Sequence, residues 1–299
     1  MALIRVDQPN IPLDRPVLVM GMEGWVDAGL AGANAMAAIV GATRTETVAT
    51  FDSDVLVDHR SRRPTQRIVD GVLDSLTWPE IQLRHGTDQR GKDILLLVGP
   101  EPDYRWRAFT HELVTFAKDL GVRLAVGLGG FPAPMPHTRP VRVIATAADQ
   151  VIANDVGFIP GVREVPAGIH AALIKGFEAE GIAALSLWAM VPHYVSGMPY
   201  PEASVQLLDR LAHVSGLGLD TAELRTAAAV TRERVDTLIS QNEEHVTMVE
   251  GLERQLDAEA ASPSAPPFTA PLFDENDLPT GDEIAAELQR FLREEGQGG

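Results

Sequence analysis

Four short polar clusters hold most of the side chains in this chain that could carry out chemistry. Each cluster lies beyond the end of an apolar run, and the clusters span residues 21–27, 99–104, 136–140 and 191–194. In an open α/β sheet, ligands and partners bind beyond the carboxyl ends of the strands, so we expect the four clusters to share one rim. That rim is where a function should be sought.

Two histidines of the rim, His137 and His193, could act as a general acid or base near neutral pH. Together with Asp27 and Glu101 they could form a hydrolytic or metal site. Single histidines in loops more often make structural hydrogen bonds, which is the competing interpretation. We therefore assign no catalytic residue, no metal and no cofactor from the sequence.

The carboxylates of the rim also have structural interpretations. Asp27 comes just before a helix-like segment, where it can cap the helix or where free amide groups can bind an anion. Glu101 and Asp103, separated by Pro102, form either a carboxylate pair for acid–base or metal chemistry or a rigid turn with one capping aspartate. In both places the capping interpretation is favoured.

Arginines concentrate at Arg60, Arg62 and Arg63, the only basic cluster of an acidic chain. Guanidinium groups hold carboxylate or phosphate with two hydrogen bonds, so this segment could bind an oxyanion or an acidic segment of a partner. Ion pairing with nearby Asp and Glu residues inside the molecule explains the cluster equally well. The sequence leaves both interpretations open.

Several well-known signatures are missing from the sequence. It contains neither standard glycine-rich nucleotide loop, no Gly-x-Ser-x-Gly elbow and no His-Glu-x-x-His motif. Nucleotide binding through those loops, serine hydrolysis and zinc proteolysis are therefore unsupported. It also contains no cysteine, which excludes disulfides and thiolate catalysis.

The net charge of −17 is concentrated in the C-terminal third, where residues 202–299 hold 20 acidic and 7 basic side chains. This charge argues against binding to nucleic acid or anionic membranes. A solvated helical surface explains it, and a docking face for a basic partner is the alternative. No apolar run approaches the ~20 residues needed to span a bilayer, and the N-terminus lacks the features of a signal peptide, so we expect a soluble, cytoplasmic protein.

Apolar runs alternate with helical patterns over the first 200 residues. Helical spacing of apolar residues covers residues 27–40, 104–120 and 166–180, and residues 77–97 indicate a hairpin. Strands that alternate with helices indicate an α/β fold with a mixed, mostly parallel sheet and helices on both faces. The strand-like runs are residues 17–22, 45–51, 81–85, 93–98, 122–128, 141–146 and 183–190.

The pattern changes after Pro201, where strand-like runs stop. The predicted division is an α/β core domain over residues 1–200, a helical region over 201–260, a Pro-rich linker over 261–281, and a terminal helix and tail over 282–299. The apolar spacing of the helical region fits a helical hairpin packed within the chain, which we favour, or a coiled coil between subunits.

Five segments together resemble the proteasome assembly chaperone 2 family in its actinobacterial form. The resemblance spans residues 1–260 approximately, and it implies a three-layer αβα core, similar to the phosphorylase/hydrolase-like fold, followed by a helical region. The segments are Gly24-Trp-Val-Asp-Ala-Gly29, Arg60-Ser-Arg-Arg-Pro64, Gly99-Pro-Glu-Pro-Asp103, Pro136-His-Thr-Arg-Pro140 and Val191-Pro-His-Tyr194, the last followed by Tyr200-Pro201.

The resemblance also implies a function. Eukaryotic and archaeal relatives act as chaperones of proteasome assembly, bacterial members have no settled function, and some relatives carry ATP-grasp or carboxylate–amine ligase labels. Members that dock on the proteasome can end in a hydrophobic-Tyr-any motif, whereas this sequence ends Glu294-Glu-Gly-Gln-Gly-Gly299. We therefore expect any contact with a partner to use a surface instead.

We predict a non-enzymatic binding or assembly-chaperone-like protein. Its expected partner is a protein, with the proteasome as one candidate, and we expect a homo-oligomer that binds neither nucleic acid nor membrane. The alternative is a small-molecule hydrolase, a phosphorylase or an ATP-dependent ligase that acts at the rim. The residues predicted to bind the ligand or partner are Trp25, Asp27, Arg60, Arg62, Arg63, Glu101, Asp103, His137, Arg139, His193 and Tyr194.

Overall fold

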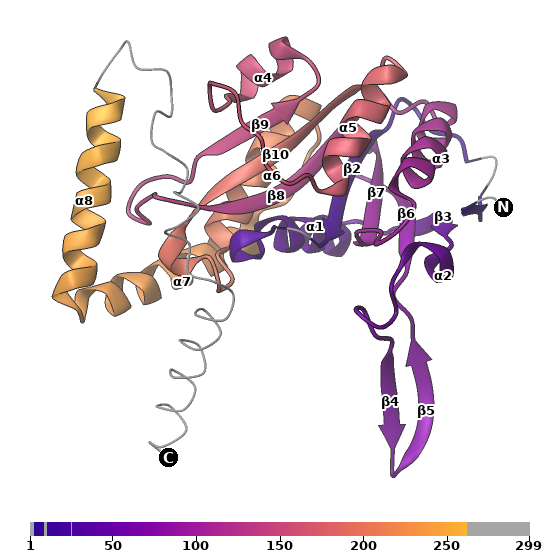
Figure 1. Cartoon of the computed structure of the whole chain (residues 1–299), viewed down its shortest axis with the longest axis horizontal. Coiled ribbons are helices and arrows are strands. Elements are labelled where there is room, and N and C mark those ends of the chain that lie inside the picture. The colour runs from indigo at the N-terminus through magenta and orange to yellow at the C-terminus, as the bar shows by residue number, and fades with distance from the viewer. Residues whose placement is uncertain (1–2, 9–10, 25, 262–299) are drawn as a thin grey trace.

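The structure is a computed structural model that describes residues 3–8, 11–24 and 26–261. Within these residues, eight strands form one sheet in the order β1-β3-β6-β7-β2-β8-β10-β9 (Figure 1). The strands are β1 (Ile4–Val6), β2 (Val17–Glu23), β3 (Glu46–Phe51), β6 (Ile81–Thr87), β7 (Asp93–Pro100), β8 (Leu124–Ala133), β9 (Val143–Ala147) and β10 (Ala183–Pro192).

Four neighbouring strands at the centre of the sheet run parallel. β2 pairs with β7 on one side and with β8 on the other, and β8 pairs with β10. Antiparallel strands flank this centre, with β6, β3 and β1 beyond β7, and β9 beyond β10. The sheet is therefore mixed around a parallel centre, and the carboxyl ends of the four central strands lie along one edge.

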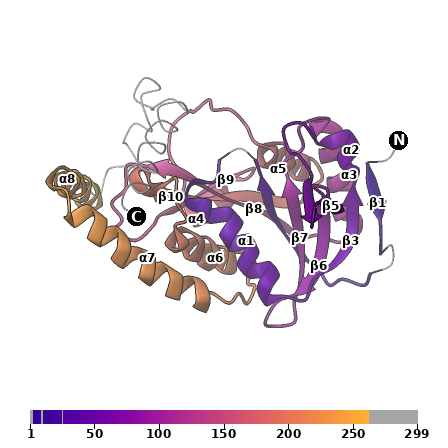
Figure 2. The same cartoon turned by 90° about the horizontal axis from the view of Figure 1, so that it is seen from below.

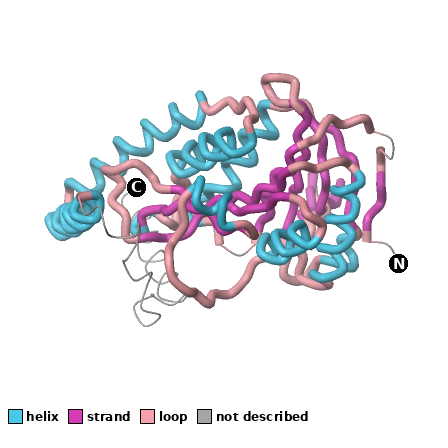
Figure 3. Tube along the Cα trace, turned by 90° about the horizontal axis from the view of Figure 1, so that it is seen from above, coloured by secondary structure: helices cyan, strands magenta, loops and turns pink. Residues whose placement is uncertain are grey.

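Helices cover both faces of the sheet because the central strands carry apolar side chains on both faces. Leu18 and Leu95 pack in the core on one face, and Val19 and Leu96 pack in the core on the other. Figure 3 shows the strands as a middle layer with helices on either side, which confirms the predicted three-layer fold. The covering helices are α1 (Ala31–Ala42) and α6 (Pro201–Ser215) on one face, and α3 (Trp106–Asp119) and α5 (Ile169–Ala179) on the other.

Two long helices, α7 (Ala222–Ser240) and α8 (Glu243–Ala260), follow α6. Figure 2 shows α7 alongside α6, and α7 buries Val235 in the same core cluster as Leu207 of α6. α8 stands at the β9 end of the molecule (Figure 1). Within the described residues no strand follows β10, so the C-terminal region is helical, as predicted.

A two-stranded hairpin, β4 (Thr65–Val69) and β5 (Val72–Thr77), projects away from the main body (Figure 1). Its turn residues Asp70 and Gly71 have φ angles of 51° and 82°. Positive φ at both positions is what a type I′ hairpin turn requires, and Asp-Gly is one of its preferred pairs. No strand-like run in the sequence predicts this hairpin, although the Asp-Gly pair signals its turn.

The remaining elements are short, and the sequence patterns do not resolve most of them. None of the described helices is long and apolar enough to cross a bilayer. The predicted terminal helix and all of the predicted linker except Ala261 lie outside the described residues. The short elements are the 3-10 turns Ala28–Leu30 and His193–Val195, α2 (Ser53–Leu56) and α4 (Gln150–Val156).

Candidate functional site at the carboxyl ends of the parallel strands

The four polar clusters meet along one edge of the sheet, as predicted. They follow β2, β7, β8 and β10, which are the four strands of the parallel centre. Trp25, one of the predicted binding residues, lies outside the described residues. The other predicted residues can each be followed to their contacts.

Asp27 caps the helical segment that follows β2. Its carboxylate accepts hydrogen bonds from the backbone N–H groups of Gly32 and Ala33 at 2.7 and 2.8 Å. Burial raises the pKa of Asp27, and hydrogen bonds from the backbone act against that rise. Because the carboxylate already occupies these amide groups at the start of α1, the capping interpretation is confirmed.

Glu101 has a similar role at the start of α5. Its buried side chain accepts a hydrogen bond at 2.5 Å from the N–H group of Ile169, the first residue of α5. Gly24 makes room for this carboxylate, since a Cβ atom at that position would lie 2.5 Å from Glu101 Oε2. Burial raises the pKa of Glu101, whereas Ile169 and Arg62 favour its ionised form.

Asp103 and Arg62 hold two loops together. Arg62 donates a hydrogen bond to the carbonyl oxygen of Glu101 at 3.0 Å, and its guanidinium lies 3.4 Å from one oxygen of Asp103. The other oxygen of Asp103 accepts a hydrogen bond from the N–H group of Asp58 at 2.7 Å. The loop after β7 is therefore tied to the segment that carries the three arginines, and Arg62 is used inside the molecule.

Arg60 and Arg63 differ from Arg62. Both are exposed, just before the β4–β5 hairpin begins at Thr65. Neither side chain makes an ion pair with the rest of the described chain. These two arginines therefore stay available for a partner at the base of the hairpin.

His137 is buried and both of its ring nitrogens have partners. Nδ1 lies 2.7 Å from the hydroxyl of Tyr194, and Nε2 lies 2.9 Å from Asp236 of α7. The Tyr194 hydroxyl also accepts a hydrogen bond from the His137 N–H group at 2.7 Å. Burial lowers the pKa of His137 against the effect of Asp236, and burial raises the pKa of Tyr194 to about 12.

Arg139 joins the loop after β8 to helix α8. Its guanidinium forms two hydrogen bonds with Asp257, at 3.1 and 2.8 Å, and a third with Glu253 at 3.1 Å. Arg232 of α7 adds a hydrogen bond to the carbonyl oxygen of His137 at 2.6 Å. The loop that carries His137 and Arg139 is thus held by both C-terminal helices.

His193 is the exposed histidine of the rim. Its ring lies edge-on to the Tyr194 ring, with 5.2 Å between the ring centroids. Partial burial lowers its pKa, against a hydrogen bond with the backbone of Ala133. It is therefore the predicted acid–base candidate that solvent reaches most easily.

The four groups required by a shared active site are engaged at different places along the rim. Asp27 binds the start of α1, Glu101 binds the start of α5, His137 contacts Asp236 of α7, and His193 is exposed to solvent. None of the four lines the cavity of about 830 Å³ described below. Within the described part of the chain, no three His, Asp or Glu side chains gather in a way that could hold a metal ion.

Sequence reasoning missed the acidic residues on α7 and α8 that contact the rim, namely Asp236, Glu253 and Asp257. A signal for two of them exists. Glu253 and Asp257 are four residues apart, so they share one face of a helix. A basic loop such as the one that carries Arg139 is the natural partner of such a face.

Comparison with protein families gives a match to the PAC2 family over residues 21–239, which includes the four rim clusters and the β4–β5 hairpin. The chain belongs to the PAC2 family. The match ends in α7, so α8 and its contacts with Arg139 lie beyond what this PAC2 family model describes.

Solved structures support the same assignment. A Corynebacterium glutamicum protein of unknown function is 29% identical, with a TM-score of 0.81 over 86% of this chain and 98% of that one. A Mycobacterium tuberculosis proteasome-assembly chaperone homologue is 34% identical, with a TM-score of 0.72 over 78% of this chain and 99% of that one. A Pyrococcus furiosus archaeal proteasome activator, 17% identical with a TM-score of 0.58 over 79% of this chain and 97% of that one, shares the fold. The comparison with curated proteins finds no match.

Proposed function

We propose that this PAC2 family protein is a non-enzymatic binding protein that takes part in the assembly of another protein complex. The observation that carries the proposal is that most side chains of the rim that could act as a general acid or base are instead bound to other parts of the fold. Asp27 and Glu101 each occupy the start of a helix, and both ring nitrogens of His137 have partners. A general acid or base needs an atom that a substrate can reach, so this arrangement favours binding over catalysis.

The partner in this proposal is a protein, and proteasome subunits are the first candidates. Support comes from two relatives, one described as a proteasome-assembly chaperone homologue and one, related by fold alone, as an archaeal proteasome activator. A cytoplasmic location belongs to the same proposal. The residues offered for partner contact are Arg60, Arg63 and His193, which are exposed and make no ion pair with the rest of the described chain. Asp103 is exposed as well, but it is paired with Arg62.

We further propose that the protein is a homo-oligomer whose subunits meet through the β4–β5 hairpin. All residues of both strands are exposed, and Ile68, Val72 and Leu73 keep 56%, 67% and 55% of their surface accessible. A two-stranded hairpin is marginally stable by itself in water, and a cluster of exposed apolar side chains marks a contact surface. A partner that covers the hairpin would stabilise it.

The distribution of charge favours a second copy of the chain as that partner. Arg60 and Arg63 lie before the hairpin at its base, and Asp70 lies in its turn. In a symmetric pair both copies use the same surface, so the basic base of one hairpin can meet the acidic tip of the other. The hairpin is therefore self-complementary in charge as well as in apolar character.

Self-association can be measured by size-exclusion chromatography with light scattering. Ile68 and Leu73 are paired across the hairpin, and replacing both with Thr removes apolar surface while keeping a residue that favours strands. One chain has a mass of 32.2 kDa. We expect the wild type to have the mass of two or more chains and the I68T/L73T variant to have the mass of one. A matched control, V230T/L238T, changes two exposed apolar residues of α7 and should keep the wild-type mass. A hairpin variant that stays as large as the wild type would contradict the proposal.

The non-enzymatic part of the proposal is tested with purified full-length protein. We expect no turnover of nucleosides, esters, peptides or ATP above a buffer blank. We also expect His137→Ala and His193→Ala to leave partner binding largely intact. Reproducible turnover that either substitution lowers by ~100-fold, the scale expected for the loss of a general acid or base, would identify an enzyme instead.

A further inference from the structure

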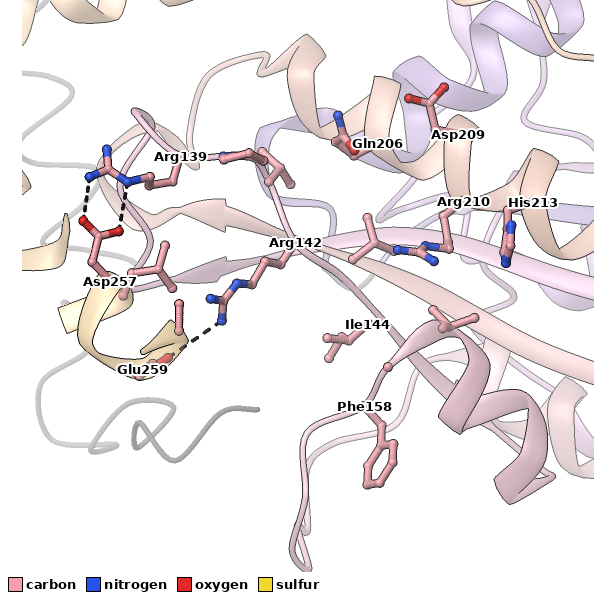
Figure 4. Close-up of a pocket in the computed structure, with 17 residues that line it drawn as sticks. Arg139, Arg142, Ile144, Phe158, Gln206, Asp209, Arg210, His213, Asp257 and Glu259 are labelled. Atoms are coloured by element: carbon pink, nitrogen blue, oxygen red, sulfur yellow. Dashed lines mark hydrogen bonds and ion pairs between the residues drawn. The ribbon is translucent and has the colours of Figure 1, made fainter. Parts of the chain in front are cut away.

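A cavity of about 830 Å³ lies along the open edge of the sheet, and of the residues described at the rim only Arg139 and its partner Asp257 line it. Figure 4 shows that the cavity is bounded by the segment leading into β9, by Phe158, by α6 and by the end of α8. Because β9 is the edge strand at one end of the sheet, one side of its backbone has no neighbouring strand among the described residues. The cavity therefore combines a strand edge with side chains from two helices.

The backbone of Val143 faces this cavity. The carbonyl oxygen of Arg142 accepts a hydrogen bond from Met190 of β10, whereas the N–H group of Ala145 donates outward to Gly157. Since backbone groups alternate in direction along a strand, the N–H and C=O groups of Val143 point outward, like those of Ala145. Within the described residues they have no hydrogen-bond partner, so one position for an added strand is open.

The floor of the cavity is apolar. Ile144, Val156 and Leu256 are buried there, and Phe158 is half-buried beside them. Such a floor suits an apolar side chain of a ligand that also pairs with the strand edge. A small polar molecule would leave this surface unused.

The charges of the cavity wall are mostly paired. Arg139 is bound to Asp257, Arg142 lies 3.7 Å from Glu259, and His213 lies 3.6 Å from Asp155. Asp209 is held by Arg225 through two contacts, at 2.8 and 2.7 Å.

Arg210 is the exception in this wall. Arg210 is half-buried, and its guanidinium has no ion pair with the described residues of the chain. Figure 4 shows the guanidinium group of Arg142 directed toward Glu259, whereas that of Arg210 lies on the α6 side of the cavity near His213. A carboxylate entering the cavity would therefore meet Arg210 as its available cation.

We propose that this cavity binds a short extended segment of a partner protein that carries a Glu or Asp. The segment forms one β-bridge with Val143, places its carboxylate on Arg210 and packs an apolar side chain against Ile144 and Phe158. The proposal names the class of partner segment for the binding function proposed above. The cavity and the β4–β5 hairpin share no residue. Peptide binding in the cavity can therefore be absent while self-association through the hairpin persists.

The chain's own residues after α8 are a poorer match to this cavity. Residues 262–273 contain no Asp or Glu, and four of the first ten are proline. Proline has no N–H group to donate to the Val143 carbonyl. The acidic residues of that segment begin at Asp274, so they form the competing occupant that the experiment must separate.

The experiment measures fluorescence anisotropy of a labelled, end-capped peptide, Thr-Val-Phe-Glu-Val-Ile-Thr, with the full-length protein. We expect saturable binding that falls at least tenfold when the peptide Glu is replaced by Gln, because a charged hydrogen-bonded pair is lost. The Arg210→Gln variant should bind the Glu and Gln peptides equally weakly. The control Arg234→Gln, an exposed arginine of α7, should bind both as the wild type does.

Further arms separate the outcomes. Alternate N-methylation of the peptide should abolish binding, since it removes the donors for the bridge with Val143. Equal binding by the R210Q and R234Q variants, unchanged binding of the N-methylated peptide, or no saturable binding up to 1 mM peptide (about −4 kcal/mol) would each overturn the proposal. Binding by a D274N/E275Q/D277N variant but not by the wild type would also overturn it, because the chain's own acidic segment would then be the occupant.

Discussion

Burial raises the pKa of two carboxyl groups at the rim, Asp27 and Glu101, in the direction expected of a general acid. The contacts of the two carboxyl groups indicate a structural role rather than a catalytic one. Asp27 accepts hydrogen bonds from two amide groups at the start of α1, and Glu101 accepts one from the first residue of α5. Each carboxylate therefore fixes the position of a helix against the end of a strand. The sequence identifies the residues and the rim correctly, but the difference between a cap and a catalyst depends on partners that are distant in the sequence, such as Ile169 for Glu101.

The role of Glu101 can be tested through pH. Burial raises the pKa of Glu101 in the folded state above 4.5, the ordinary value for a glutamate, so just above pH 4.5 the folded state holds more protons than the unfolded state. The free energy of unfolding therefore falls as the pH rises from the unfolded pKa of Glu101 through its folded pKa. Above the folded pKa the carboxylate is ionised in both states, so the full cost of burying its charge is present. Glu101→Gln keeps an acceptor for Ile169 but removes the charge. We expect its melting temperature relative to wild type to rise between pH 4 and pH 7, by a few degrees at most, because 1 kcal/mol corresponds to roughly 2–4 °C in a chain of this size.

The control for this experiment is Glu101→Ala. It removes the acceptor as well as the charge, so the melting temperature should fall at both pH values by the equivalent of about 0.5–2 kcal/mol for a lost cap. A Glu101→Gln variant that is less stable at pH 7 than at pH 4, relative to wild type, would show that the ionised carboxylate is favourable where it lies.

At the scale of elements, the sequence predicts best those segments whose burial produces a regular pattern. The central strands and helices α1, α3 and α5 are found within a few residues because their apolar side chains face a core. The β4–β5 hairpin has no buried face, so no hydrophobic period marks it, and only the Asp70-Gly71 turn does. The elements that the pattern misses, β1, α2 and α4, are each too short to show a period.

The contact between the rim and α8 also belongs to this scale, and it leads to a prediction. Arg139→Met removes the hydrogen bonds to Asp257 and Glu253 while keeping much of the side-chain volume. Since ion pairs near the surface make only a modest contribution to stability, we expect amide hydrogen exchange in α8 to become about fivefold faster. Exchange in β8 and α5 should stay unchanged.

A matched control is Arg254→Met, which removes an arginine of α8 whose contact is with Glu250 of the same helix. Exchange in α8 should change much less in this variant. Equal exchange in the two variants would mean that Arg139 does not hold the helix on the rim.

At the scale of the whole molecule, this protein combines a rim of capped helices, an exposed apolar hairpin and a net charge of −17. The acidic excess of the C-terminal third, read from the sequence as either a solvated surface or a docking face, is partly used inside the molecule. Asp236, Glu253 and Asp257 all contact the loop after β8. Composition could not reveal this use, because it depends on which helix folds back onto which loop.

The most direct test of the proposed assembly role is quantitative affinity capture of the tagged, full-length protein from its native cells. We expect the wild type to retain at least one other protein, or assembly intermediates of the proteasome, in near-stoichiometric amounts. The I68T/L73T variant should be captured without a second copy of the chain. Recovery of the wild type with no protein in more than trace amounts would contradict the central claim that this protein works by binding other proteins.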